Sequence, residues 1–506
     1  MKFERSSGVL LHPTSLPGSY GIGDIGPKAH EWIDFLSTSG CNLWQVLPLG
    51  PTGYGDSPYQ CFSAFAGNPY IISPDSLLSN GLLTYDDIRD RPSFQIEKVD
   101  YGKVIPYKIK LLNRAFENFQ SNAHSQAGKA FQTFCKNEVH WLDDYALFMT
   151  IKEVQGGGPW VDWPAHLRNR DTAALNTFKD EYAADITRQA FWQFLFFQQW
   201  SALRKYAIKR GINIIGDIPI FVAHDSADVW ANPELFLLDK SGRPTVVAGV
   251  PPDYFSPTGQ LWGNPLYRWD IHAENDYRWW LDRLRAVFSM VDIVRLDHFR
   301  GFSGYWEIPA DEETAENGQW VPGPGAKFFD AVKKSLVSLS IIAEDLGEIT
   351  PDVVELRDQF DLPGMKILVF AFDSDEENEF LPHNYHTPNC VVYTGTHDND
   401  TTRGWYERAD DKIRDYARRY LARDGHDIAW DLIRAAWSSV AVFALAPLQD
   451  LLNLGNEARM NYPSKPSGNW LWRMSPRTLT DSLRARLQDM NHLYARHSKS
   501  TMEKSE

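Results

Sequence analysis

Residues 291–298 read Val-Asp-Ile-Val-Arg-Leu-Asp-His, an apolar strand sequence that gains charge towards its C-terminal end. Arg295 and Asp297 stand two positions apart, and side chains alternate between the faces of a strand, so these two project to the same side. In a barrel, that side is the lumen near the mouth where active sites lie. A guanidinium beside Asp297 favours its ionised form. The stretch predicts a buried strand that ends at a functional site.

Seven further short apolar runs alternate with segments of helical period, such as residues 29–36. Eight near-continuous apolar strands favour an all-parallel sheet, and eight is the number that closes a barrel. We therefore predict an α/β fold, a (β/α)8 TIM barrel with large, mainly helical insertions in its strand-to-helix loops. A doubly wound open sheet has the same periodicity and is the alternative. The predicted strands are residues 8–12, 42–47, 212–218, 292–297, 340–345, 364–372, 390–396 and 440–447.

The predicted strands are unevenly spaced. About 160 residues separate the second from the third, far more than an ordinary connection, and this segment has helical patterns of its own. Two stretches rich in glycine and proline follow the third and fourth strands. The predicted organisation is 1–50 as the start of the barrel, 51–205 as an inserted subdomain, 206–495 as the rest of the barrel with a 249–265 lid or cleft wall and a 309–325 insertion, and 496–506 as a frayed tail.

The amino-acid composition limits the kinds of molecule that the protein is expected to bind. A formal net charge of -15 over 506 residues repels nucleic-acid phosphates, whereas 13% aromatic residues suit a large core and flat surfaces for sugar rings. No stretch reaches the length of a membrane span, and the first residues lack the apolar run of a signal peptide. The expected protein is cytoplasmic, a monomer or weak homo-oligomer. Its four scattered cysteines fit a reducing compartment; they are Cys41, Cys61, Cys135 and Cys390.

Gly21, Gly23 and Gly26 spell G-x-G-x-x-G just before a helix, the pattern of a dinucleotide-binding loop. The context does not fit that reading, because the preceding strand ends near His12 and no acidic residue follows the next strand to hold a ribose. We expect a loop that reverses direction, with no cofactor. No metal is expected either, since the sequence has no H-E-x-x-H and no clear zinc-ligand spacing.

Acidic residues arrive at four of the predicted strand ends. They are Asp217, Asp297, the adjacent pair Glu344 and Asp345, and Asp398. Neighbours on a strand alternate faces, so only one of Glu344 and Asp345 faces the mouth, and the pattern does not choose between them. Retaining glycoside chemistry needs a nucleophile and an acid/base about 5–5.5 Å apart. The four acids predict an active site of that kind.

Several long motifs resemble the 4-α-glucanotransferases known as amylomaltases or disproportionating enzymes, glycoside hydrolase family 77. Residues 51–59, for example, read Pro-Thr-Gly-Tyr-Gly-Asp-Ser-Pro-Tyr. The resemblance covers nearly the whole chain, and its motifs are ordered and specific. They are residues 11–18, 51–59, 251–256, 260–265, 294–298 and 468–473.

The resemblance implies a role for each matching residue. Asp297 is expected to be the nucleophile and Glu344 the general acid/base. Asp398, beside His397, is expected to stabilise the transition state, and Arg295 to position and ionise Asp297. The remaining expected substrate contacts are Asp217 near the cleavage point and the glucan-contacting positions Tyr59, Phe255, Trp262 and Asn469.

The implied reaction cleaves an α-1,4 bond of a glucan or malto-oligosaccharide and holds half of it as an ester. The 4-hydroxyl of another glucan or of glucose then attacks. An α-amylase-like retaining hydrolase would use the same pair of carboxyl groups and is the alternative within the enzyme class. The residues alone do not decide whether water or a sugar hydroxyl attacks the ester. A non-catalytic glycan-binding protein is the alternative of another class, since aromatic clefts suit both.

Overall fold

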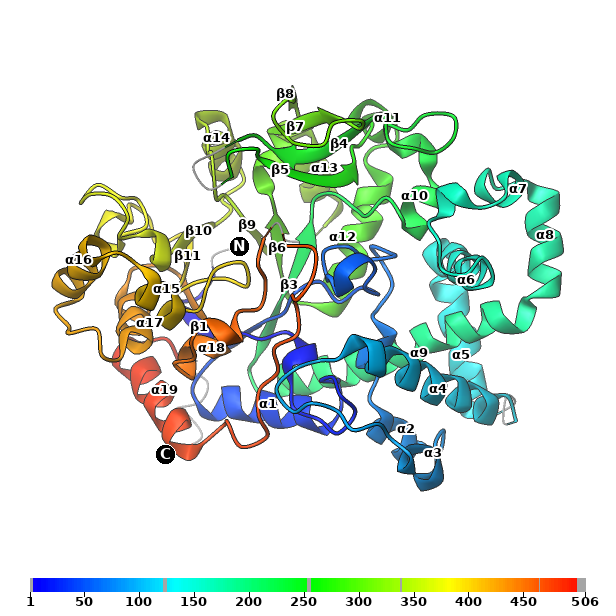
Figure 1. Cartoon of the computed structure of the whole chain (residues 1–506), viewed down its shortest axis with the longest axis horizontal. Coiled ribbons are helices and arrows are strands. Elements are labelled where there is room, and N and C mark those ends of the chain that lie inside the picture. Colours follow the sequence, from blue (N-terminus) through cyan, green and yellow to red (C-terminus); the bar gives the residue numbers. More distant parts are fainter. Residues whose placement is uncertain (1–2, 122–124, 253–255, 337–338, 464, 498–506) are drawn as a thin grey trace.

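Eight parallel strands form the centre of the computed structural model, which describes residues 3–121, 125–252, 256–336, 339–463 and 465–497 (Figure 1). Each predicted strand overlaps one of them. In order around the sheet they are β10 (Gly364–Ile367), β11 (Cys390–Tyr393), β12 (Phe443–Pro447), β1 (Ser6–Leu10), β2 (Leu43–Gln45), β3 (Asn213–Pro219), β6 (Ile293–Asp297) and β9 (Ile341–Ala343).

The sheet curls until its two end strands meet. Among the described residues, seven parallel ladders join successive strands from β10 round to β9. The last seam is bridged where the Ala343 N–H donates to the Pro363 carbonyl at 2.9 Å and the Met365 N–H donates to the Asp345 carboxylate at 2.7 Å. The predicted (β/α)8 barrel is confirmed, and the open-sheet alternative is wrong.

Alternate residues of each strand fill the barrel lumen, as the period of a strand requires. Ile215 and Ile293 belong to one buried apolar cluster with inward residues of the other strands. Two positions further along, the same faces carry Asp217 and Arg295, which the ladder pairs directly. The lumen therefore changes from apolar to charged towards the C-terminal ends of the strands.

Helices wrap the barrel, and the longer ones such as α1, α12 and α17 bury an apolar face against it. In α1, Pro27 occupies the first turn, where the missing N–H costs nothing, and Trp32, Ile33 and Leu36 are buried. Gly40 follows at φ +78°, a conformation that favours glycine. The helices around the barrel are α1 (Pro27–Thr38), α9 (Ala183–Lys209), α10 (Ala227–Ala231), α11 (Trp269–Glu274), α12 (Arg278–Met290), α13 (Gly325–Ser335), α14 (Pro351–Gln359), α15 (Thr402–Arg408), α16 (Asp411–Leu421), α17 (Ile428–Ser438), α18 (Leu448–Leu451) and α19 (Asp481–Leu493).

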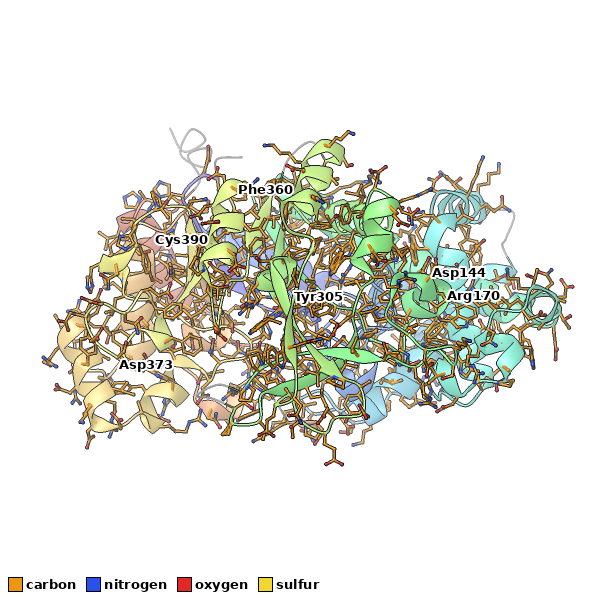
Figure 2. All side chains as sticks on the ribbon, turned by 90° about the horizontal axis from the view of Figure 1, so that it is seen from above. Asp144, Arg170, Tyr305, Phe360, Asp373 and Cys390 are labelled. Atoms are coloured by element: carbon orange, nitrogen blue, oxygen red, sulfur yellow. The ribbon has the colours of Figure 1, made fainter. Side chains whose placement is uncertain are left out.

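A helical region stands between β2 and β3, within the predicted 51–205 insertion, and α9 leads from it back to the barrel (Figure 1). Phenylalanines form its centre; Phe119 stacks on Phe191 at 4.3 Å between ring centroids. An ion pair of 2.6 Å between Arg170 and Asp144 ties the turn between α7 and α8 to α6 (Figure 2). Its helices are α2 (Pro74–Ser79), α3 (Tyr85–Arg89), α4 (Tyr101–Gln120), α5 (Gln126–Asn137), α6 (Val139–Val154), α7 (Ala165–Arg168) and α8 (Thr172–Glu181).

A second, antiparallel sheet was not predicted. It lies at the top of the view in Figure 1, and its strands run in the order β5 (Gln260–Pro265), β4 (Val246–Val250), β7 (Gly304–Pro309) and β8 (Gln319–Pro322). The predicted 249–265 lid supplies β5 and part of β4, and the 309–325 insertion supplies β8. These short strands contain glycines and prolines, so their composition resembles that of loops and the sequence did not indicate strands.

The C-terminal end of the described chain is packed. Arg496, where the predicted tail begins, is fully buried, and its Nε donates to the Trp437 carbonyl at 2.7 Å. Residues 498–506 of that tail lie outside the described residues. No helix in the described part of the chain combines the length and the apolar character needed to cross a bilayer.

Candidate active site

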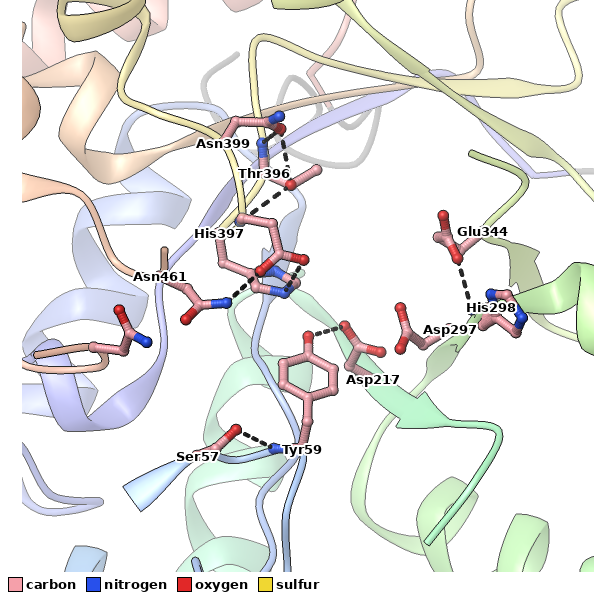
Figure 3. A network of polar contacts seen from close by, with 12 residues as sticks. Ser57, Tyr59, Asp217, Asp297, His298, Glu344, Thr396, His397, Asn399 and Asn461 are labelled. Carbon is pink, nitrogen blue, oxygen red and sulfur yellow. Dashed lines mark hydrogen bonds and ion pairs between the residues drawn. The ribbon is translucent and has the colours of Figure 1, made fainter. Parts of the chain in front are cut away.

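Three acidic residues come from three adjacent strands at one end of the barrel. The β3–β6 register pairs Asp217 with Arg295, and the β6–β9 register, continued by one residue beyond Ala343, sets Glu344 opposite Asp297. Neighbouring strands lie about 4.8 Å apart, so the carboxyl groups of Asp297 and Glu344 face one space (Figure 3).

A single guanidinium nitrogen organises two of these acids. Arg295 Nη1 donates to both Asp217 oxygens at 2.9 Å and to Asp297 Oδ1 at 2.8 Å. Burial raises the pKa of the Asp217 carboxyl to about 6, with the Arg295 charge acting in the opposite direction. The pKa of Arg295 is raised well above its usual value because the two carboxylates outweigh the effect of burial. Asp297 is thus fixed beside a permanent positive charge.

Glu344 differs from Asp297 in its surroundings. The backbone N–H groups of His298 and Leu346 donate to its two oxygens, at 2.6 and 3.1 Å. His298 adopts a left-handed conformation at φ +53°, unusual for a residue other than glycine, which aims its N–H at Glu344. Burial and the charge of Asp297 together raise the pKa of Glu344 to about 8. Its pKa therefore lies well above that of an ordinary glutamate, as a proton donor requires.

The neighbour of Glu344 points elsewhere. Asp345 accepts from Arg357 Nη1 at 2.6 Å and from the Met365 N–H at 2.7 Å, at the seam of the barrel. The structure thus places Glu344 in the cleft and gives Asp345 partners on the strand and helix beyond it.

His397, the neighbour of Asp398 in the chain, stands on the opposite side of Asp297 from Glu344 (Figure 3). His397 Nε2 lies 3.2 Å from Asp398 Oδ2, and Asn461 Nδ2 donates to Oδ1 at 2.7 Å. Burial tends to raise the pKa of Asp398, but His397 and Asn461 outweigh it and hold the pKa well below its usual range. The pKa of His397 is raised in turn, since the attraction of Asp398 outweighs burial.

Tyr59 links Asp217 to His397. Its hydroxyl donates to Asp217 Oδ2 at 2.9 Å, and its ring stacks on His397 with 5.1 Å between centroids. Trp470 packs against both rings at 5.9 Å. Residues from four separate segments therefore form one wall, which faces Glu344 across Asp297 (Figure 3).

The acids open into a cleft of about 1820 Å³. Most of the residues predicted for the site line it: Tyr59, Trp262, Arg295, Asp297, Glu344, His397 and Asp398. Asp217 lies beneath Arg295 and is 5% exposed. Asn469 uses its amide within its own loop, where it accepts from the Tyr462 N–H at 3.0 Å and donates to the Lys465 carbonyl at 2.8 Å. Phe255 lies outside the described residues.

Three residues that shape the active site were not predicted from the sequence. Asn461 holds Asp398 across 63 residues of chain, a separation at which an isolated asparagine gives no signal. His298 acts through its backbone, which its side chain does not reveal. Trp470 stands inside the 468–473 motif quoted for the family resemblance, so a signal for it was present.

The glycine-rich loop before α1 satisfies its own backbone groups. The Gly23 N–H donates to the Thr14 carbonyl at 2.9 Å, and the Gly26 N–H donates to Asp24 at 3.0 Å. A Cβ on Gly23 would lie 2.0 Å from the Pro13 carbonyl oxygen. The glycines here serve close packing of the chain. Among the described residues, no group of three or more His, Cys, Asp or Glu side chains is placed to hold a metal ion.

Carboxylates gathered at the C-terminal ends of parallel barrel strands define a class, the (β/α)8-barrel proteins with a glycosidase-type acidic site. The chain also belongs to a particular family within that class, glycoside hydrolase family 77, whose description is 4-alpha-glucanotransferase and which matches residues 11–480. This confirms the resemblance found in the sequence.

Two relatives show how complete the match is. A 4-alpha-glucanotransferase of Thermus thermophilus is 52% identical over 497 residues, 97% of this chain and 99% of the relative. One of Synechocystis is 50% identical over 97% of this chain and 98% of the relative. Among solved structures, the amylomaltase of Streptococcus agalactiae in complex with acarbose superposes with a TM-score of 0.95 at 40% identity, covering 98% and 100% of the two chains.

Proposed function

We propose that this protein is a retaining 4-α-glucanotransferase that moves a glucanyl segment from one α-1,4-glucan to the 4-hydroxyl of another glucan or of glucose. The observation that carries the proposal is the asymmetry of the facing pair: Asp297 is bound by Arg295 at 2.8 Å, whereas Glu344 is buried beside Asp297 with a raised pKa. One carboxyl group able to give a proton and another able to attack are the two requirements of a retaining mechanism.

In the first half of the reaction, Glu344 protonates the oxygen of the scissile bond as Asp297 attacks the sugar carbon from the other face. The bond to the leaving glucan breaks, and an ester to Asp297 forms. Arg295 balances the charge on Asp297 and holds its orientation through the 2.8 Å contact. Asp398, kept ionised by His397 and Asn461, stabilises the positive charge that develops on the sugar ring.

In the second half, the same Glu344 accepts a proton. Ester formation removes the charge of Asp297, which is the second cause of the raised pKa of Glu344. The pKa of Glu344 therefore falls once the intermediate has formed, and the group becomes a base towards the incoming 4-hydroxyl. The charge of one acid thus switches the role of the other.

Transfer prevails over hydrolysis when the attacking group is a sugar held in the cleft. The relatives in the family are 4-alpha-glucanotransferases, which supports transfer and does not favour an α-amylase-like hydrolase. Trp262 lines the cleft as a stacking surface, and the 249–265 and 51–205 regions are the segments we expect to keep water from the ester.

Incubation with maltotriose tests the proposal. We expect a ladder of shorter and longer oligomers with little net gain of reducing ends, resolved by chromatography. Asp297→Asn is the matched variant, because it keeps the shape of the side chain but removes the nucleophile; we expect a loss of turnover of about 10⁴-fold or more, with glucan binding nearly unchanged. Stoichiometric release of reducing ends would establish hydrolysis instead, and activity retained by Asp297→Asn would refute the nucleophile assignment.

The binding partners and the compartment follow as parts of the same proposal. Malto-oligosaccharides and longer α-1,4-glucans are the substrates, and nucleic acid is not a partner, given a net charge of -15. The cytoplasm is the proposed compartment, on the composition of the chain and its four free thiols. A monomer or weak homo-oligomer is the proposed state. A binding protein without catalysis would not need the proton-bearing Glu344.

A further inference from the structure

Trp320 of β8 is a large apolar side chain exposed in the cleft. It is 40% exposed and lines the same cleft as Asp297 and Glu344. The mechanism described above gives it no task. Single exposed apolar residues are common on protein surfaces, so exposure alone does not indicate a binding role. The contacts that hold this indole in place are more specific.

Two neighbours fix the indole. The guanidinium carbon of Arg300 lies 3.7 Å from the centre of the Trp320 ring, a close cation–π stack. Arg300 is itself only 6% exposed, and its Nη1 donates to the Glu348 carbonyl at 2.5 Å. Trp306 meets Trp320 at 5.2 Å and 67°, an edge-to-face contact. A ring held in this way loses little conformational entropy when a ligand binds to it.

The hairpin that carries Trp320 is fastened to the segment that follows the strand of Asp297. Trp320 pairs with Trp306 in the β7–β8 ladder. Beyond β8, the Gly323 N–H donates to the Ser303 carbonyl at 2.8 Å. A Cβ on Gly323 would lie 2.4 Å from the Phe302 carbonyl oxygen, so only glycine permits the approach. The position of Trp320 is thereby set relative to Asp297.

The contacts of Arg300 show which side of the cleft the indole occupies. Arg300 follows Asp297 by three residues and bonds to Glu348, which follows Glu344 by four, so it links the segments after β6 and β9. Figure 3 shows Glu344 on one side of Asp297, with Tyr59 and His397 on the other. A general acid protonates the leaving group. The leaving and incoming glucans therefore lie on the side of Glu344 and Trp320.

We infer that Trp320 is a stacking platform for a glucosyl unit of the acceptor, one or more units beyond the sugar that supplies the attacking hydroxyl. The flat, C–H-rich face of an α-1,4-linked glucose matches the exposed indole, and the buried Arg300 holds that indole in place. The inference rests on the proposed glucan transfer and adds to it a preference for acceptors longer than glucose.

Acceptor kinetics with an activated donor test this inference. α-Maltosyl fluoride forms the ester on Asp297 as the C1–F bond breaks, and fluoride leaves without needing a proton. Loss of the Asp297 charge lowers the pKa of Glu344, which releases its proton to solvent. The acceptor 4-hydroxyl then attacks C1, the C1–O bond to Asp297 breaks, and Glu344 takes the hydroxyl proton. Fluoride release at a fixed donor concentration is measured against glucose and against maltotetraose. Variants are Trp320→Ala, Trp320→Phe and the control Ile208→Ala, an apolar residue of α9 that is 53% exposed and does not line the cleft.

We expect Trp320→Ala to raise the KM for maltotetraose by about tenfold, while the KM for glucose changes by less than twofold. Trp320→Phe keeps a flat ring and is expected to recover most of the loss, and Ile208→Ala is expected to match the wild type with both acceptors. Equal effects of Trp320→Ala on the two acceptors, or an unchanged KM for maltotetraose, would overturn the platform. Failure of the wild type to transfer to either acceptor would instead refute the proposed function.

Discussion

One nitrogen atom, Nη1 of Arg295, binds both Asp217 and Asp297, whereas the hydrogen bonds that Glu344 accepts from described residues come from backbone N–H groups. The difference separates two carboxyl groups that stand opposite each other on adjacent strands. The fixed cation binds Asp297, whereas burial and the charge of Asp297 raise the pKa of Glu344 to about 8. Two carboxyl groups of the same chemical type thus receive different roles because their hydrogen-bonding and charged partners differ.

Replacing Glu344 with glutamine separates its two duties. We expect Glu344→Gln to lose about 10³-fold or more in turnover of maltotriose, because the leaving sugar then lacks its proton. Formation of the ester from α-maltosyl fluoride is expected to survive in part, since fluoride needs no acid. Burst-phase release of fluoride measures that step. Equal losses with the two donors would count against the acid role.

The raised pKa of Glu344 also predicts a dependence of stability on pH. The pKa is about 8 in the folded chain against an ordinary value of 4.5, so the folded state holds this proton more tightly. The stabilisation is complete below pH 4.5 and is lost as the pH rises through 8. The melting temperature of Glu344→Gln minus that of the wild type should therefore grow between pH 5 and pH 8.5. A constant difference would show that the pKa is not raised.

Strand ends and the family motifs predicted the acids of the site, but the choice between Glu344 and Asp345 depended on the resemblance. Alternation along a strand says that one of the two faces inward without saying which, because a one-residue change of phase exchanges them. Asn461 and the backbone of His298 were beyond prediction, since their roles arise from long-range packing and from a left-handed φ.

At the scale of elements, the loop after β11 is held at both ends by one buried carboxylate. Asp450 of α18, which is 1% exposed, accepts from the Thr394 hydroxyl at 2.5 Å and from the N–H and hydroxyl of Thr402, each at 2.7 Å. The segment between these threonines carries His397 and Asp398. Asp450 is therefore a positioning residue for a carboxylate that it does not touch.

Removing this carboxylate should loosen the loop. We expect Asp450→Ala to lower kcat by about 10- to 100-fold, because misplacement of a charged group by a fraction of an ångström weakens transition-state stabilisation, and to cost about 2 kcal/mol of stability through the unpaired donors. Asp450→Asn keeps an acceptor for the Thr402 N–H and should recover most of kcat. Assays at a temperature where circular dichroism shows all variants folded separate the two effects. Asparagine no better than alanine would contradict the positioning role.

The elements that the sequence predicted best are those with strong periodicity. Barrel strands are buried on both faces and read as continuous apolar runs, and all eight were found. The antiparallel sheet was missed because β4 pairs with β7 from another loop, and Gly249, Gly263 and Pro265 within β4 and β5 suggest turns. Its pairing is set by tertiary contacts, which no local pattern records.

At the scale of the whole molecule, the barrel depends on one seam. Seven neighbouring strand pairs of the described chain have ladders, whereas β9 and β10 rely on the Ala343–Pro363 bond and on Asp345. A Cβ on Gly364 would lie 2.3 Å from Asp345 Oδ2, so this glycine makes room for the carboxylate. Asp345 therefore helps to close the barrel that positions its neighbour Glu344, the predicted acid/base.

Asp345→Ala should weaken the fold and leave the chemistry. The Asp345 side chain is 5% exposed. Its removal leaves the buried Met365 N–H without an acceptor and Arg357 without one of its two carboxylate partners, which should lower the free energy of unfolding by about 2–4 kcal/mol. Asp358→Ala is the matched control: it removes a partner of the same Arg357 that is 61% exposed, and it should cost less than about 0.5 kcal/mol. Urea unfolding measures both, and kcat of the folded Asp345→Ala should stay within about threefold of the wild type. A stable Asp345→Ala variant without activity would instead transfer the acid/base role from Glu344 to its neighbour.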